Sequence, residues 1–233
     1  MTSFYKSILS YRYRLAIFIL LGAASILSVA LYRFRGFWYE EEGFTSLVWN
    51  LFLAWIPLIL AYTAWALSLG RKWLFVVIPF IAFIWLIFLP NAPYILTDFN
   101  HLAEPNPNVP IWFDVMMLLW FSWTGLLLGI VSLYLMQDIV RREFGRWVGW
   151  IMVFIVSGLS SIGVYIGRFI HWNSWDILTD PTGTARQFLV GTQDPSLRSI
   201  GFIIIFTGFF LFVYLTLYAF GHLLQEPMAK PKP

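Results

Sequence analysis

Six long apolar segments dominate the 233-residue sequence. They cover residues 15–31, 47–67, 73–90, 111–136, 147–166 and 199–223. A helix needs about 20 mostly apolar residues to cross the hydrocarbon core of a bilayer. None of the six segments shows the alternation with period two that is typical of a membrane barrel strand. The expected fold class is therefore an all-α, polytopic membrane helix bundle with about six transmembrane helices.

Composition supports this class and excludes several others. Hydrophobic residues make up 60% of the chain and charged residues 12%, whereas soluble domains have about 45–50% and about 25%. The net charge of +3 is small and spread along the chain, so we expect a lipid bilayer and no nucleic acid as partner. The chain has no cysteine, which excludes disulfides, thiolate metal sites and a cysteine nucleophile. We expect one integral membrane helical domain over residues 1–226 and a short disordered C-terminal tail over residues 227–233.

The Lys and Arg residues predict the orientation, because cytoplasmic segments carry an excess of both. With a cytoplasmic N-terminus, the inner segments hold two thirds of these residues: Lys6, Arg12, Arg14, Arg71, Lys72, Arg141, Arg142, Arg146, Lys230 and Lys232. The outer segments then hold Arg33, Arg35, Arg168, Arg186 and Arg198. Both termini are therefore predicted to be cytoplasmic.

Polar residues collect where the third apolar segment ends, in the stretch FLPNAPYILTDFNHL. Pro90 and Pro93 each remove a backbone donor, so the helix cannot continue unchanged. Asn91 lies between them and can satisfy freed backbone groups or a ligand. Asp98 and His101 follow with a spacing of three, which places both on one face of a helix. This spacing suits two ligands of one metal or a carboxylate that orients an imidazole, and equally a capped helix end with a surface ion pair.

Two other regions place polar groups at the same predicted membrane face. Asp114 opens the fourth apolar segment, where an ionisable side chain is costly unless it is paired or faces a wet cavity. We expect Arg168 to be its salt-bridge partner, as the nearest basic residue in the predicted topology. Arg168 begins a polar stretch in which His171, Asn173 and Asp176 follow.

The topology brings all these residues to one side of the membrane, because the third and fifth segments end there and the fourth begins there. We expect them to line a single outward-facing polar pocket: Asn91, Asp98, His101, Asp114, Arg168, His171, Asn173 and Asp176. Metal binding at this pocket is left open, and no cofactor is assigned. In the membrane interior, Asn50 is expected to form an interhelical hydrogen bond, and Gly125 and Gly129 to let helices approach closely.

Three of these regions resemble the domain-of-unknown-function family number 1361, which consists of uncharacterised bacterial multi-pass membrane proteins. They are residues 88–102, the pair Trp112 and Asp114 leading into Gly125, Gly129, Ser132 and Leu133, and residues 167–176. The resemblance covers roughly residues 50–220 and implies a multi-pass protein of the bacterial plasma (inner) membrane. It supplies no activity, substrate or cofactor. The family commonly has Arg at the position of His171, which argues against chemistry that depends on this histidine.

Three classes of function remain open. The preferred one is a non-enzymatic accessory or binding protein, which uses its polar outer face to engage a membrane-protein partner or a lipid headgroup. The second is a membrane-embedded hydrolase or transferase, with or without a metal, that acts on a lipid-linked substrate. Its ligands or acid–base groups would be Asp98, His101, Asp114, His171 and Asp176. The third is a small transporter.

Overall fold

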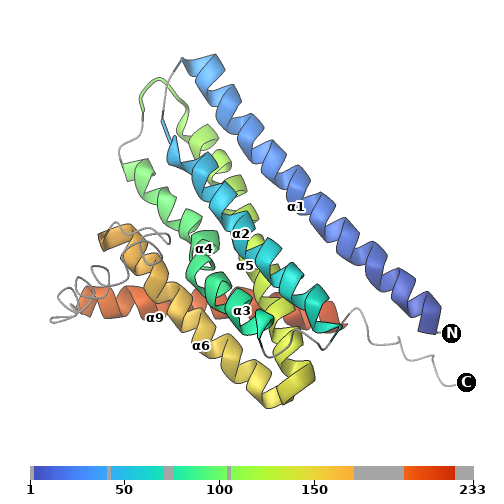
Figure 1. Cartoon of the computed structure of the whole chain (residues 1–233). Coiled ribbons are helices and arrows are strands. Elements are labelled where there is room, and N and C mark those ends of the chain that lie inside the picture. Colours follow the sequence, from blue (N-terminus) through green and yellow to red (C-terminus); the bar gives the residue numbers. More distant parts are fainter. Residues whose placement is uncertain (1–2, 41–42, 71–75, 104–105, 171–196, 224–233) are drawn as a thin grey trace, which may run out of the picture. The chain divides into compact units, whose positions relative to one another are not determined.

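The computed structural model describes residues 3–40, 43–70, 76–103, 106–170 and 197–223 (Figure 1). It contains six helices that are long and apolar enough to cross a membrane, and no strand within the described ranges. The predicted all-α, polytopic membrane fold is therefore confirmed. The chain divides into two compact units, Met1–Ile139 and Val140–Pro233, which we describe separately. The single domain over residues 1–226 stays a prediction, and the proposed tail lies outside the described residues.

The first unit is built from four membrane-spanning segments. Its elements are α1 (Ser3–Tyr39), α2 (Ser46–Ser68), α3 (Val77–Phe88), α4 (Asn91–Tyr94), the 3-10 helix η1 (Ile95–Ala103) and α5 (Ile111–Phe144), which belongs to this unit as far as Ile139. Helix α1 lies along one side of α2, and α3 and α4 lie along the other (Figure 1). The second and third apolar segments are thus neighbours in this unit.

Helix α1 contacts the rest of the unit through a narrow stripe. Among its described side chains, only Leu21, Ser28 and Arg35 are buried, and a spacing of seven keeps residues on one helix face. The neighbouring Ser25 Oγ accepts a hydrogen bond from the indole Nε1 of Trp55 in α2 at 3.0 Å. The predicted end of this span at residue 31 is wrong. The helix continues to Tyr39 because no proline interrupts it and Arg35 finds a partner inside the unit.

The third span changes its backbone conformation at its two prolines, as predicted. Helix α3 ends at Phe88, a single short turn forms α4, and the chain continues as η1. The amide of Ala92 donates to the carbonyl of Leu89 at 3.1 Å. This carbonyl would otherwise bond the amide of residue 93, but Pro93 has no N–H.

This irregular segment packs closely against α5 at Gly125. A Cβ atom placed there would lie 2.7 Å from the carbonyl oxygen of Ala92 and 2.8 Å from Ile95 Cδ1. Nearby, Ser122 Oγ donates to the carbonyl of Ile95 at 3.1 Å. The close helix approach that we expected at Gly125 is therefore confirmed, and only a residue without a side chain permits it.

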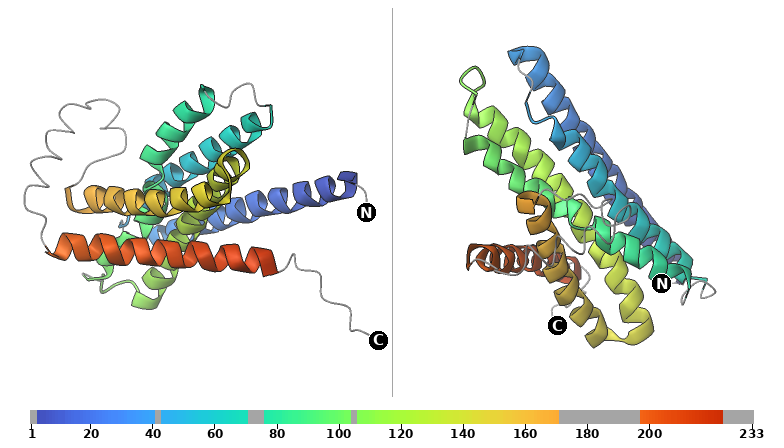
Figure 2. Two further views of the ribbon diagram at one scale, coloured as in Figure 1. Left: turned by 90° about the horizontal axis from the view of Figure 1, so that it is seen from below. Right: turned by 60° about the vertical axis from the view of Figure 1, so that its left-hand side comes forward.

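The second unit contains the end of α5, then α6 (Arg146–Tyr165), the π-helical turn η2 (Ile166–Ile170) and α9 (Leu197–Leu223). Gly145 alone separates α5 from α6, and its φ of 92° is a conformation that glycine adopts readily. The predicted segments 111–136 and 147–166 leave residues 137–146 as a connection, whereas α5 and α6 include all of these residues except Gly145. Helices α6 and α9 pack together (Figure 2), and the Tyr165 hydroxyl lies 2.6 Å from Ser199 Oγ.

We predict that Gly125→Ala destabilises the protein by about 1–3 kcal/mol, because the new methyl group overpacks a backbone contact that cannot move aside. Thermal unfolding in mild detergent would measure this change. Gly22→Ala is the matched control, since a Cβ at Gly22 in α1 meets nothing within 4 Å. A Gly125→Ala variant as stable as the control would contradict the packing described for α4.

Candidate functional site

The centre of the candidate site is a buried ion pair between α1 and α5. Arg35 Nε donates to Asp114 Oδ1 at 2.7 Å, and Arg35 Nη2 donates to Asp114 Oδ2 at 3.2 Å. Each residue is only 3% exposed. Asp114 lies in the first turn of α5, where the helix dipole also favours a negative charge. Asp114 is thus paired, as expected, and its partner is Arg35. Arg168, the partner expected from the sequence, belongs to the second unit, so that pairing stays a prediction.

The turn between α1 and α2 covers the guanidinium of this pair. The Phe44 ring lies over Arg35, with its centroid 4.9 Å from Cζ, in the geometry of a cation–π contact. Phe44 has a φ of 56°, a conformation that costs about 1–3 kcal/mol for such a residue. The contact with Arg35 offsets part of this strain. The same ring meets His101 edge to face at 5.5 Å, so Asp114, Arg35, Phe44 and His101 form a continuous chain of contacts.

Asp98 forms a second polar contact in this unit, which joins η1 to α2. It is 1% exposed, and its Oδ2 accepts a hydrogen bond from Asn50 Nδ2 at 3.1 Å. The interhelical hydrogen bond predicted for Asn50 is therefore confirmed. His101 lies one turn further along η1 and is exposed. Within the described part of the chain, no group of three or more His, Cys, Asp or Glu side chains could hold a metal ion.

Asn91 serves the backbone at the proline interruption. Its Nδ2 donates to the carbonyl of Phe88, the last residue of α3, at 2.9 Å. This oxygen lies where the regular hydrogen bonding of α3 ends. An unsatisfied backbone carbonyl in the membrane would cost roughly several kcal/mol. Of the two roles left open for Asn91, the structure therefore shows the satisfaction of a freed backbone group.

The eight residues of the predicted pocket fall into three sets. Asn91, Asp98, His101 and Asp114 lie in the first unit, in the positions given above. Arg168 lies half-buried in η2 of the second unit. The remaining three lie outside the described residues: His171, Asn173 and Asp176. The shared pocket therefore stays a prediction.

Arg35 is a site residue that the sequence prediction assigned to a loop. The signal that identifies it is its spacing of seven from Ser28, which is itself seven residues after Leu21. Residues at this spacing share a helix face, so Arg35 continues the inward stripe of α1. Phe44 has no comparable signal, because its position depends on a turn with positive φ.

A cluster of aromatic side chains is formed by residues that neighbour Arg35 and Asp114 in the sequence. The buried Phe113 ring contacts Phe34, Tyr39 and Trp112, each at a centroid distance of 5.8 Å. Phe34 in turn stacks on Trp38 at 5.6 Å. Trp38 and Trp112 remain 64% and 63% exposed. We call Phe34, Trp38 and Trp112 the aromatic patch.

The fold and this site define a multi-pass helical membrane protein with a buried ion pair at one end of its first unit. Residues 49–213 match the family described as "Protein of unknown function (DUF1361)". The match covers more than half of the chain, so the chain belongs to this family, as its resemblance indicated. No curated protein and no solved structure matches the chain. Asp114 lies within the matched region, whereas its partner Arg35 precedes it.

We predict that Arg35→Ala or Asp114→Ala alone lowers the free energy of unfolding by about 3–5 kcal/mol, because each leaves one buried charge unpaired. The double variant should lose less than the sum of the two single losses. Unfolding in mild detergent, arranged as a double-mutant cycle, measures this coupling. Arg33→Ala is the control on the same helix, since Arg33 is exposed. Strictly additive losses would show that the two charges do not interact.

Proposed function

We propose that the protein is a non-enzymatic accessory or binding protein of the membrane. It engages a membrane-protein partner through the end of the first unit that carries the aromatic patch. The observation that supports this proposal most strongly is the exposure of Trp38 and Trp112 around a buried aromatic centre, Phe113. Rigid aromatic side chains of this kind are enriched at protein interfaces and often supply most of the binding energy.

The polar groups beneath the patch favour a protein over a lipid headgroup as the partner. A headgroup would need accessible charges, but Arg35 and Asp114 are almost fully buried and bonded to each other. Asp98 is likewise buried and bonded to Asn50. These contacts hold α1, α2, η1 and α5 in fixed positions, so the patch is organised before a partner binds. Preorganisation of this kind lowers the entropic cost of association.

We also propose that both termini are cytoplasmic, in the bacterial plasma (inner) membrane, so that the aromatic patch faces outward. The excess of Lys and Arg in the segments on the side of the N-terminus supports this orientation. An even number of spans returns the chain to the side on which it began. The turn between α1 and α2, beside the patch, then lies outside the membrane.

The orientation predicts a clear pattern of cysteine labelling, since the chain has no native cysteine. In intact cells, a membrane-impermeant maleimide should label Thr45→Cys, which is exposed between α1 and α2. It should label Ser3→Cys only after the cells are permeabilised. The opposite pattern would reverse the proposed topology.

The partner can be tested by a photoreactive amino acid placed at Trp112 in native membranes. We expect one protein adduct of discrete mass, because a docked partner covers this position. We expect the adduct to disappear when Trp38→Ala is added, since both residues belong to the patch. Met116 is the matched control, because it is exposed one turn further along α5. Adducts with phospholipid alone at Trp112, or equal products at both positions, would contradict the proposal.

A further inference from the structure

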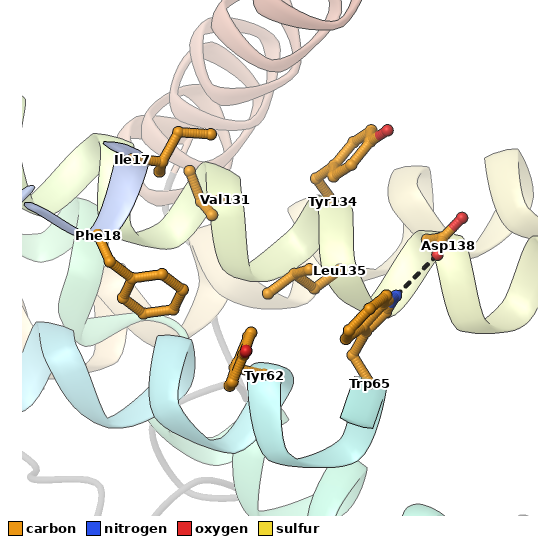
Figure 3. A pocket seen from close by; sticks show the side chains of 8 residues that line it. All are labelled: Ile17, Phe18, Tyr62, Trp65, Val131, Tyr134, Leu135 and Asp138. Carbon is orange, nitrogen blue, oxygen red and sulfur yellow. Dashed lines mark hydrogen bonds between the residues drawn. The ribbon is translucent and has the colours of Figure 1, made fainter. Parts of the chain in front are cut away.

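The first unit contains a cavity of about 160 Å³ between α1, α2 and α5. Its lining residues are Ile17, Phe18, Tyr62, Trp65, Val131, Tyr134, Leu135 and Asp138 (Figure 3). Four of these eight side chains are aromatic, and one is a carboxylate. Among the side chains that the structure describes, no Lys, Arg or His belongs to the lining. Arg141 and Arg142 lie about one helical turn beyond Asp138 in the sequence.

Contacts between the lining residues hold the aromatic wall in place. Phe18 meets Tyr62 edge to face at 5.1 Å, and Tyr62 stacks against Trp65 at 6.1 Å. Trp65 Nε1 donates to Asp138 Oδ2 at 2.9 Å, which fixes the carboxylate at the edge of the cavity. Figure 3 shows the three rings in a row, with Trp65 joined to Asp138 at one end. The wall is therefore a set of aromatic rings that ends in a negative charge.

We infer that this cavity binds an organic ammonium cation. The faces of aromatic rings carry negative charge density and attract cations, most strongly at Trp and Tyr, and aromatic cages are the usual binding sites of quaternary ammonium groups. The carboxylate of Asp138 attracts the same ligands. A cavity of about 150 Å³ is known to hold a molecule the size of benzene, so a small alkylammonium group fits the volume found here.

The position of the cavity allows two sources of the ammonium group. Trp65 lies near the C-terminal end of α2, about 22 Å along the helix from Asn50 at a rise of about 1.5 Å per residue. The cavity therefore lies near the membrane surface opposite the aromatic patch. An aminophospholipid headgroup or a free amine could reach it there. This inference goes beyond the proposed function and concerns the other end of the unit, so each can fail without the other.

The test uses purified full-length protein in a neutral maltoside detergent, with tetramethylammonium as the probe and tert-butanol as a neutral probe of similar size. Calorimetric titration should show saturable binding of tetramethylammonium and none of tert-butanol. Asp138→Asn removes the charge but keeps an oxygen for the Trp65 bond, and should weaken binding by about tenfold or more. Glu143→Gln removes one acid from the same helix outside the cavity and should leave binding unchanged.

A second variant, Val131→Phe, fills the cavity without altering its charge and should also abolish binding. Equal binding of both probes, or unchanged binding in Asp138→Asn, would overturn the inference, because the cavity would then be merely apolar.

Nanodiscs distinguish the two sources. Retention of phosphatidylethanolamine over phosphatidylglycerol in native mass spectrometry supports a lipid headgroup, and tetramethylammonium binding without this preference supports a free amine. Binding of neither ammonium compound would refute the site.

Discussion

The buried ion pair of Arg35 and Asp114 is the contact on which the arrangement of the first unit depends. Helices in a bilayer gain no hydrophobic energy from leaving lipid for one another, so packing and polar bonds must hold them together. Over the part of α1 whose side chains are described, the buried residues form a narrow stripe, and the ion pair lies at its outer end. Because separation of the charges would leave both uncompensated in a medium of low dielectric, the pair fixes the position of α1. The strained turn at Phe44 follows from it, since its ring covers the guanidinium.

The irregular part of the third span obeys the same constraint. Non-helical backbone at membrane depth is tolerated only when protein or a wet cavity satisfies its polar groups. Here Asn91 bonds the end of α3, Ser122 bonds the carbonyl of Ile95, and Asn50 bonds Asp98. The absent side chain of Gly125 lets Ala92 and Ile95 approach α5 closely. The prolines thus interrupt the regular helix, and Asn91 of the same segment and Ser122 of α5 satisfy backbone carbonyls of the irregular stretch.

The sequence could predict the features that depend only on local composition or on the lipid environment of a residue. Long apolar runs must form helices in lipid, and an Asn inside such a run must find a hydrogen-bond partner, as Asn50 does. The partner of Asp114 could not be predicted in this way, because it depends on where α1 ends. With the span ending at residue 31, Arg35 falls in a loop and Arg168 is the nearest candidate. Because α1 continues to Tyr39, Arg35 lies on the helix, where it can reach Asp114.

Aromatic residues gather at both ends of the first unit. The aromatic patch has a filled centre, whereas the rings near Asp138 line a cavity, and this difference explains why we propose a different ligand for each. At the end that carries the ion pair, Phe34 and Trp112 contact the buried side chain of Phe113, so the centre of this cluster is filled and its outer surface is available for contact. A filled centre suits a large partner that lies across the patch. Near Asp138, the rings line a partly open cavity beside a carboxylate. A volume of about 160 Å³ suits a small molecule or headgroup rather than a folded partner, and the Asp138 carboxylate favours a cation.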